Sequence, residues 1–511
     1  MKRLAAASVV LFGLRLWAAS TVGFGDSEAL YVSWAAHPQP AYLDHPGLVG
    51  LFARLVGGGV PSPFVAHLVT SIVATLVPWL VLATARALGA SKDRAEIAGL
   101  AVALVPETAV GLFGLTPDLL LAPTWLGAIA LAVVGLRGEG TGPRAEGAPL
   151  GAVGAEPQVG STRSAGALLG AGLLSGIAAS AKVSGLLLVL ALALSYVVVA
   201  RGRRPEARIA RGVWPWAGLL AGIIVVLPIV AYETHLDFPM ARHRLVDSQA
   251  GAGLALRNVG ALVGGQLLYL SPLFAWIAVR VARDLVRRRN EDVATWTLFA
   301  TFALPIVPLV GLCLWSPVAE PHWIAPALLA LPIAAALAPA SLPSRRVMVA
   351  AFATAGVFTL AAHLWVLTPL SSVLAPNDPR DISSELYGWP KVTAEIRDQL
   401  RLAATPFDPE GHDAALVGPH WTVCAQLQAN VRDVRVGCAT PIKDDFDRWY
   451  PRDEWRKADH VLWVTDARFP GDGAEQLPRH VKVAEKKVEV TRGGRVARTF
   501  VLSLYSRRGA G

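Results

Sequence analysis

The chain has 511 residues, of which 53% are hydrophobic and only 17% are charged, with a net charge of +9 and a mean hydropathy of +0.46. A soluble globular protein carries roughly a quarter charged residues, so the composition excludes that class and indicates an integral membrane protein. The basic excess comes largely from arginine clusters between apolar runs, which is a feature of membrane topology and not of nucleic-acid binding.

The first apolar run extends to about Ala19, after the basic start Met1-Lys2-Arg3. A signal peptide would look similar, but no clear small-residue cleavage site follows and many more apolar runs do. We therefore predict a transmembrane helix with its N-terminus inside, in a chain of about eleven spans. The further predicted spans lie near residues 64–88, 95–115, 117–136, 165–181, 183–200, 214–232, 259–279, 294–314, 323–340 and 348–368.

Basic residues alternate from loop to loop. The dense clusters lie at residues 86–94, 137–163, 201–211, 280–289 and 345–346. Because cytoplasmic loops are enriched in Lys and Arg, this register places the clusters inside and residues 370–511 outside. It also requires a hairpin broken at Lys182 within 165–200, since one long helix there would turn every later cluster outward.

Two internal segments, at 138–163 and 170–176, are rich in small residues and need separate interpretation. The stretch at about 138–163 is rich in Gly, Ala and Pro and has no hydrophobic periodicity, which predicts a disordered cytoplasmic linker. The segment GAGLLSG at 170–176 resembles a nucleotide-binding glycine pattern. It lies inside an apolar run, however, so we interpret it as close helix packing through small residues.

The chain becomes polar after Pro369, and its pattern predicts a small α/β domain. The expected elements are a helix starting at Pro390, a buried strand at 460–464, and a hairpin of 481–490 and 496–504 around Gly493-Gly494. If this part is outside the cytoplasm, Cys424 and Cys438 can pair. Two free thiols remain an equal alternative, and Cys313, in an apolar run, is expected to be inert.

Ionisable residues gather at the ends of the apolar runs, on the side opposite the arginine clusters. Charges at a membrane are costly unless they have a function or a partner. Bundled helices would bring them to one cavity, where carboxylates can act as base or metal ligand and cations can hold phosphate. These residues are Asp26, Glu28, Asp44, His45, Asp118, Lys182, Arg242, His243, Arg244, Glu320 and His322.

Several of these residues also have a purely structural interpretation. Asp44 can cap a turn and Asp118 can cap a helix. Lys182 can extend its amine to the interface, and Arg242 and Arg244 can anchor at lipid headgroups. Their clustering on one face favours function.

Short motifs occur in a characteristic order along residues 1–370. They are Asp26-Ser-Glu28-Ala-Leu-Tyr31, Tyr42-Leu-Asp44-His45-Pro46, Thr116-Pro117-Asp118, Ala181-Lys182, Gly264-Gly265-Gln266 and Pro321-His322-Trp323. In this order they resemble the GT-C superfamily of integral membrane glycosyltransferases, in particular the bacterial branch similar to protein O-mannosyltransferases and lipid A aminoarabinose transferase. The resemblance implies an all-α polytopic membrane domain, residues 1–369, followed by an extracytoplasmic α/β domain, residues 370–511.

The resemblance implies a glycosyltransferase of the hexosyl or pentosyl class in the inner (plasma) membrane. It would move a sugar from a polyprenyl-phosphate donor to a hydroxyl of a lipid, glycan or protein acceptor on the outer face. It implies Asp26 first and Glu28 second as the catalytic carboxylate. The implied donor-phosphate residues are His45, Lys182, Arg242 and Arg244, with support from Asp44, Asp118, His243, Glu320 and His322. In the family the acidic pair is often adjacent, whereas Ser27 intervenes here.

Two alternatives stay open at this point. Asp44, His45 and His243 can instead bind a divalent metal ion, since mixed carboxylate–imidazole sites suit zinc or manganese. The chain can also be a transporter, a flippase or a binding protein for lipid-linked sugars. The sequence shows no matching halves or paired broken helices of the kind transporters often have, which favours the transferase.

Overall fold

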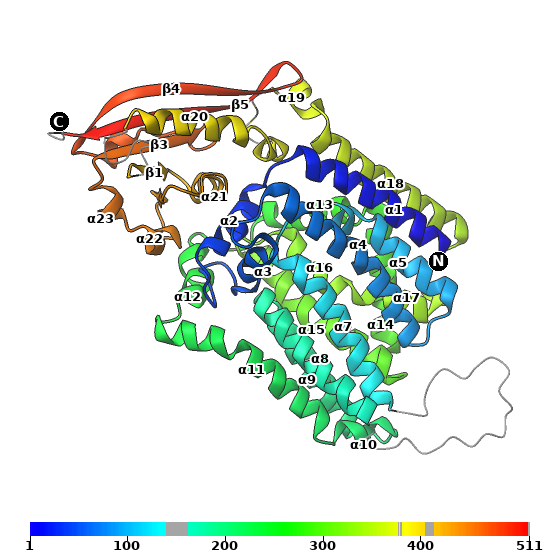
Figure 1. Ribbon diagram of the computed structural model, residues 1–511. Helices are drawn as coiled ribbons and strands as arrows, with labels where there is room; N and C mark the ends of the chain where they lie inside the picture. The colour runs from blue at the N-terminus through cyan, green and yellow to red at the C-terminus, as the bar shows by residue number, and fades with distance from the viewer. Residues whose placement is uncertain (139–161, 377, 379–380, 404–412, 509–511) are drawn as a thin grey trace.

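The computed structural model describes residues 1–138, 162–376, 378, 381–403 and 413–508. Most of the predicted linker at 138–163 therefore lies outside the described residues. A helical bundle is followed by a region built around a five-stranded sheet, which covers one end of the bundle (Figure 1). The fold class expected from the sequence is thus confirmed in its coarse form, mostly helical with a small C-terminal sheet.

Among the described residues, seven helices are long and apolar enough to cross a membrane. An eighth span results if α13 (Leu256–Tyr269) and α14 (Pro272–Arg288), bent by 103° at their junction, are counted together. The predicted number of about eleven is not confirmed. The seven are α1 (Lys2–Thr21), α4 (Pro63–Ala87), α7 (Pro117–Arg137), α8 (Thr162–Ala181), α11 (Trp214–His235), α15 (Val293–Trp315) and α18 (Arg345–Leu367).

The remaining predicted spans are helical but short or broken. The run at 95–115 divides into α5 (Lys92–Leu104) and α6 (Pro106–Ala109), because Pro106 has no N–H to continue the helix. The run at 183–200 is α9 (Gly185–Arg201), which has 17 residues. The run at 323–340 divides into η3 (Pro321–Ile324), α16 (Ala325–Leu328) and α17 (Ala330–Leu337).

The glycine segment at 170–176 packs α8 closely against α11. A Cβ atom added to Gly172 would lie 1.9 Å from the carbonyl oxygen of Gly218, and one added to Gly176 would lie 2.3 Å from that of Gly222. Only glycine permits this approach of two backbones, so the interpretation as helix packing is confirmed.

Helices α8 and α9 form the predicted hairpin. Lys182 lies in the break between Ala181 and Gly185, and the two helices pack along each other. The break places the lysine at the end of the bundle that faces the C-terminal region.

The C-terminal region, which follows Pro369, contains one mixed sheet. Its strand order is β2-β1-β3-β5-β4, with β1 parallel to β2 and β3 and with β5 antiparallel to β3 and β4. Gly493 and Gly494 have φ of 57° and 75°, as the predicted two-residue hairpin turn requires. The elements are α20 (Trp389–Arg401), β1 (Ala415–Gly418), α21 (Trp421–Asn430), β2 (Val436–Cys438), β3 (His460–Asp466), β4 (His480–Arg492) and β5 (Arg495–Arg507).

The first loop of the bundle belongs to the core of the C-terminal region. Helix α2 (Asp26–Ser33) packs against α21 (Figure 1), and Phe24 and Trp34 share a hydrophobic core with Val423 and Leu427. This shared core fixes the position of the loop. The shorter helices are η1 (Trp34–Ala36), α3 (Leu48–Gly57), α10 (Glu206–Ala210), α12 (Pro239–Leu245), η2 (Asp247–Gln249), η4 (Pro339–Ser341), α19 (Leu370–Leu374), η5 (Ile382–Leu386), α22 (Phe446–Trp449), α23 (Arg452–Trp455) and η6 (Gly473–Glu475).

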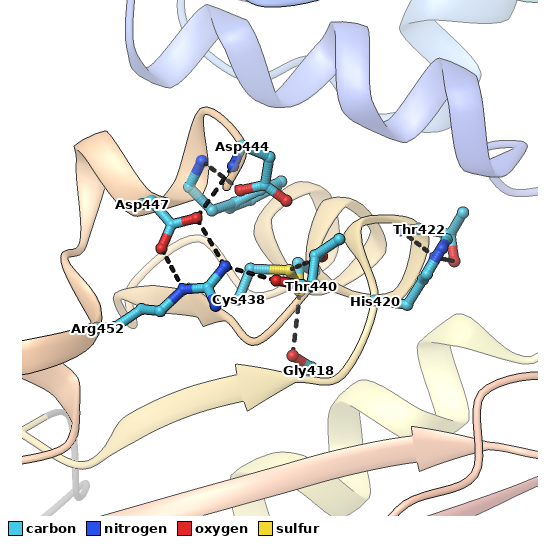
Figure 2. The surroundings of a disulfide bond; sticks show 10 residues. Gly418, His420, Thr422, Cys438, Thr440, Asp444, Asp447 and Arg452 are labelled. Carbon is cyan, nitrogen blue, oxygen red and sulfur yellow. Dashed lines mark hydrogen bonds and ion pairs between the residues drawn. A yellow bond between two sulfur atoms is a disulfide. The ribbon is translucent and has the colours of Figure 1, made fainter. Parts of the chain in front are cut away.

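A disulfide joins Cys424 of α21 to Cys438 at the end of β2, with Cα atoms 5.8 Å apart (Figure 2). Of the two alternatives left open by the sequence, the structure adopts pairing. We expect Cys424→Ser to lower the free energy of unfolding by about 3 kcal/mol, the value for closing a loop of this length. Thermal unfolding of the purified protein with and without reductant measures the difference. Rapid alkylation of both thiols in unreduced native membranes would contradict the bond.

Candidate active site

A cavity of about 1550 Å³ lies where the bundle meets the C-terminal region. Its walls come from α2, the loop after it, the start of α7, α12, η3, α18 and residues 440–446. Three of the predicted site residues, Asp26, Glu28 and Arg242, are absent from its lining. The predicted residues that do line it are Asp44, His45, Asp118, Lys182, His243, Arg244, Glu320 and His322.

One wall carries a chain of paired charges. The Lys182 amine donates to both carboxylate oxygens of Asp118, at 2.9 and 2.7 Å. His322 Nε2 lies 3.7 Å from Asp118, and its Nδ1 lies 3.0 Å from Glu320. Because Asp118 follows Pro117 in the first turn of α7, its carboxylate also faces the positive end of that helix. Lys182 is thus held in the wall by a fixed counter-charge.

A second cluster surrounds Arg244, at the end of α12. Its Nε donates to the carbonyl oxygen of Asp44 at 2.9 Å, and its Nη2 lies 3.2 Å from the Asp44 carboxylate. The same Nη2 lies 3.3 Å from His45 Nε2, and His243 Nε2 lies 3.9 Å from Asp44 Oδ1. The guanidinium also lies over the ring of Trp323, 5.6 Å from its centre. These contacts direct a second fixed cation into the cavity.

His45 is neutral in this setting. Burial, followed by the charges of Arg244, Lys182 and His322, holds its pKa well below the usual range. Arginine can only donate, so the ring accepts at Nε2 and carries its proton at Nδ1. That Nδ1 is buried without a hydrogen-bond partner. His45 can therefore offer a neutral N–H to a phosphate oxygen, but not a positive charge.

The predicted metal ligands do not assemble. His45 Nε2 faces the Arg244 guanidinium, and a metal ion on that nitrogen would be repelled by the arginine. In the part of the chain that the structure describes, no group of three or more His, Cys, Asp or Glu side chains could hold a metal ion. The set Asp44, His45 and His243 is therefore corrected to an Arg244-centred cluster.

Helix α2 turns Asp26 and Glu28 away from the cavity. Residues three and four apart share one face of a helix, and here Ser27, Leu30 and Tyr31 form the face that lines the cavity. Positions 26 and 28 lie on either side of that face, roughly 100° from position 27. The expected catalytic carboxylates therefore point elsewhere, and the residue between them reaches the site.

The carboxylates of Asp26 and Glu28 are both buried, and both already have hydrogen-bond partners. Asp26 accepts from Arg468 Nη1 at 2.7 Å and from the Gln426 amide at 3.0 Å. Glu28 contacts His67 Nε2 at 3.0 Å and accepts from the Leu115 backbone N–H at 2.7 Å. Neither carboxylate lines the cavity in this structure, and a base at either position stays a prediction. Both fix the first loop in place.

Arg242 also departs from its expected place. Its side chain is 69% exposed and lies 3.8 Å from Asp247, so it does not join Arg244 in the cavity. Conversely, Glu107, His420 and Asp444 line the cavity but were not expected there. Glu107 lies within the predicted span 95–115, and the other two reach the site only because the C-terminal region folds over it.

No protein-family model and no curated protein matches the sequence. Among solved structures, ArnT from Cupriavidus metallidurans bound to undecaprenyl phosphate is similar, with a TM-score of 0.60 and 15% identity over 98% of this chain and 97% of ArnT. The chain has the GT-C fold. The oligosaccharyltransferase of Archaeoglobus fulgidus is also similar, with a TM-score of 0.50 and 12% identity over 91% of this chain and 69% of that enzyme. The resemblance inferred from the motifs is thereby confirmed at the level of the fold.

Proposed function

We propose that the protein is a glycosyltransferase that moves a sugar from a polyprenyl-phosphate donor to a hydroxyl of a lipid, glycan or protein acceptor. The observation that carries this proposal is a cavity with two fixed cations and one apolar wall. The cations are Lys182 and Arg244, and the wall is contributed by Val357, Ala361 and Trp365 of α18. An anionic head attached to an isoprenoid tail matches both surfaces, and the similar ArnT structure binds undecaprenyl phosphate.

The charged groups suit departure of the lipid phosphate. As the bond from the anomeric carbon to the phosphate oxygen breaks, negative charge grows on that oxygen. Lys182, Arg244 and the Nδ1–H of His45 are donors that can stabilise it. Asp118 and Asp44 hold the two cations in position beforehand, and such preorganised donors are worth about 10²–10³-fold in rate each.

The proposal also includes location. We place the protein in the inner (plasma) membrane with many spans, and the cavity and the C-terminal region, residues 370–511, outside the cytoplasm. Two features support this orientation. The arginine clusters lie in loops that would face the cytoplasm, and the Cys424–Cys438 disulfide is typical of oxidising compartments. A transporter or a binding protein for lipid-linked sugars has no specific observation in its favour.

Binding of undecaprenyl phosphate to the purified protein tests the donor half of the proposal. We expect saturable binding that undecaprenol, which lacks the phosphate, does not show. Arg244→Ala should weaken binding roughly 10- to 100-fold, the range for losing a hydrogen bond to a charged group. Arg242→Ala is the matched control, since this neighbouring side chain lies outside the cavity lining.

The sugar-transfer half of the proposal is tested by detecting the sugar product. Mass spectrometry of glycolipids and envelope glycans from cells with and without the protein should show the loss of one sugar. Equal affinity of the Arg244→Ala and wild-type proteins for the lipid phosphate, together with unchanged glycans, would refute the function.

A further inference from the structure

The cavity needs a carboxylate for the acceptor, and several of the described carboxylates that line it on the bundle side are already paired, although Glu107 also lines that side. An attacking hydroxyl must lose its proton, and a positioned carboxylate is a suitable base. Asp118 is paired with Lys182, Asp44 with Arg244 and Glu320 with His322. These carboxylates already hold cations or imidazoles. Besides Glu107, the opposite wall offers a further candidate for the acceptor's partner.

The opposite wall is the segment 440–446 of the C-terminal region, together with His420. The segment is anchored at both ends. It follows Cys438 of the disulfide, and Arg452 donates to the Thr440 carbonyl oxygen at 2.6 Å (Figure 2). On the bundle side, the backbone N–H of Leu43 donates to Asp445 at 3.1 Å. The wall is thus held rigidly against the first loop, next to Asp44.

Asp444 is the carboxyl that this wall presents. Its Oδ1 accepts from the Phe446 backbone N–H at 3.0 Å, which fixes the orientation of the group. Its Oδ2 is buried and makes no hydrogen bond of normal geometry, although the Thr440 hydroxyl acts on the carboxyl and the residue lines the cavity. A buried, unpaired carboxylate oxygen is costly, so it indicates a partner that comes from outside the chain.

We propose that Asp444 binds the acceptor hydroxyl through Oδ2 and takes its proton during transfer. This role rests on the proposed function. The hydroxyl O–H bond breaks and its proton passes to Oδ2, while the hydroxyl oxygen forms a bond to the anomeric carbon. The bond from that carbon to the phosphate oxygen breaks, and its electron pair leaves with the lipid phosphate toward Lys182 and Arg244. Donor and acceptor therefore meet between two walls of different origin.

The protonation behaviour of Asp444 agrees with this role. Burial, followed by the charge of Asp447, raises the pKa of Asp444 to about 7. The Phe446 N–H, the Thr440 side chain and the Arg452 guanidinium oppose that rise. A base titrating near neutral pH can both accept and release a proton efficiently. The rate of transfer should therefore fall as the pH drops through about 7.

Asp444→Asn tests the assignment, because asparagine keeps the oxygen that accepts from Phe446 but cannot take a proton. The variant is expressed in cells that lack the wild-type protein, and the sugar product is measured by mass spectrometry. We expect the product to form at least about 10²-fold more slowly, with binding of undecaprenyl phosphate within about twofold of wild type. Asp453→Asn is the matched control, an 80% exposed carboxylate of the same region, and should transfer normally.

The outcomes separate this assignment from the function on which it rests. A wild-type protein that binds undecaprenyl phosphate but forms no sugar product refutes the proposed function itself. Product formation by Asp444→Asn at a near-normal rate refutes only the role of Asp444. If the Asp444→Asn protein does not accumulate in cells, the Asp444→Ser variant tests the assignment instead, since serine can still accept from the Phe446 N–H. Normal transfer by it overturns the assignment.

Glu107 is the alternative candidate for the base. It also lines the cavity, but the charges of His322, Asp118 and Lys182 act on it, so it lies on the side where the phosphate leaves. Glu107→Gln should therefore keep its dependence on pH near 7, whereas Asp444→Asn should lose it. Loss of that pH dependence in Glu107→Gln and its retention in Asp444→Asn would transfer the role to Glu107.

Discussion

Lys182→Met is expected to slow sugar transfer by about 10²–10³-fold, the usual effect of removing one preorganised donor from a site where negative charge develops. The Lys182 side chain is 6% exposed, and its amine is held by both oxygens of Asp118. It lies in the break between α8 and α9 and cannot be replaced by a neighbouring cation of the same segment. Lys182→Arg keeps the charge and should recover part of the rate. Product formation is followed by mass spectrometry.

A structural role of Lys182 must be separated from its role in catalysis. Removing one partner of a buried ion pair typically costs 3–5 kcal/mol, whereas replacing both partners with apolar residues is often nearly neutral. Lys182→Met alone should therefore lower the thermal stability, and the double variant Lys182→Met/Asp118→Leu should recover it. If the amine acts on the phosphate, the double variant stays inactive. Recovery of transfer together with stability would show that Lys182 serves only as the partner of Asp118.

The membrane fold followed from features that local sequence records well. Apolar runs, alternating arginine clusters and the glycines of α8 each reflect a direct physical requirement. The number of spans did not follow, because a break at one residue is invisible to a hydropathy window. Pro106 ends α5 early, and Ser271, with a φ of 68°, bends the chain between α13 and α14. Both positions lie within otherwise continuous apolar runs.

The cavity was predicted from the positions of ionisable residues at helix ends, which can be found in the local sequence. The local sequence does not show which face of a short helix points toward the cavity. In α2, burial of Ala29 and Val32 in the core shared with α21 sets the phase, and this core forms with residues about 400 positions away in the chain. The sequence motif thus marks the right helix, but Ser27 and not Asp26 faces the cavity.

The acceptor wall could not be predicted for the same reason. Asp445 and Leu43 are 402 positions apart, and only their contact brings the segment 440–446 to the site. Nothing in the local pattern around Asp444 distinguishes it from a surface turn. A buried oxygen without a partner becomes visible only once both parts of the chain are placed.

The largest expected effect on stability comes from Arg468, which joins the C-terminal region to the first loop. Its guanidinium lies 2.7 Å from Asp26, 3.0 Å from Asp466 and 3.6 Å from Glu385. The Asp26 and Asp466 side chains are 6% and 0% exposed. Arg468→Met would leave Asp26 buried without its cation, whereas Asp466 would keep its ion pair with Arg498. We expect it to lower the free energy of unfolding by about 3–5 kcal/mol, measured by thermal and denaturant unfolding in detergent.

The matched control is Arg435→Met, in the same region, whose ion pair with Glu454 is largely exposed and should be worth at most about 1 kcal/mol.

The ion pairs around Arg468 also predict how Asp26→Asn behaves. Asparagine can still accept from the Gln426 amide but no longer pairs with Arg468, so the variant should lose stability along with Arg468→Met. In a double-mutant cycle the two losses should be strongly non-additive, because they remove one shared contact. A stable Asp26→Asn protein with transfer reduced about 10²-fold would instead support Asp26 as the base.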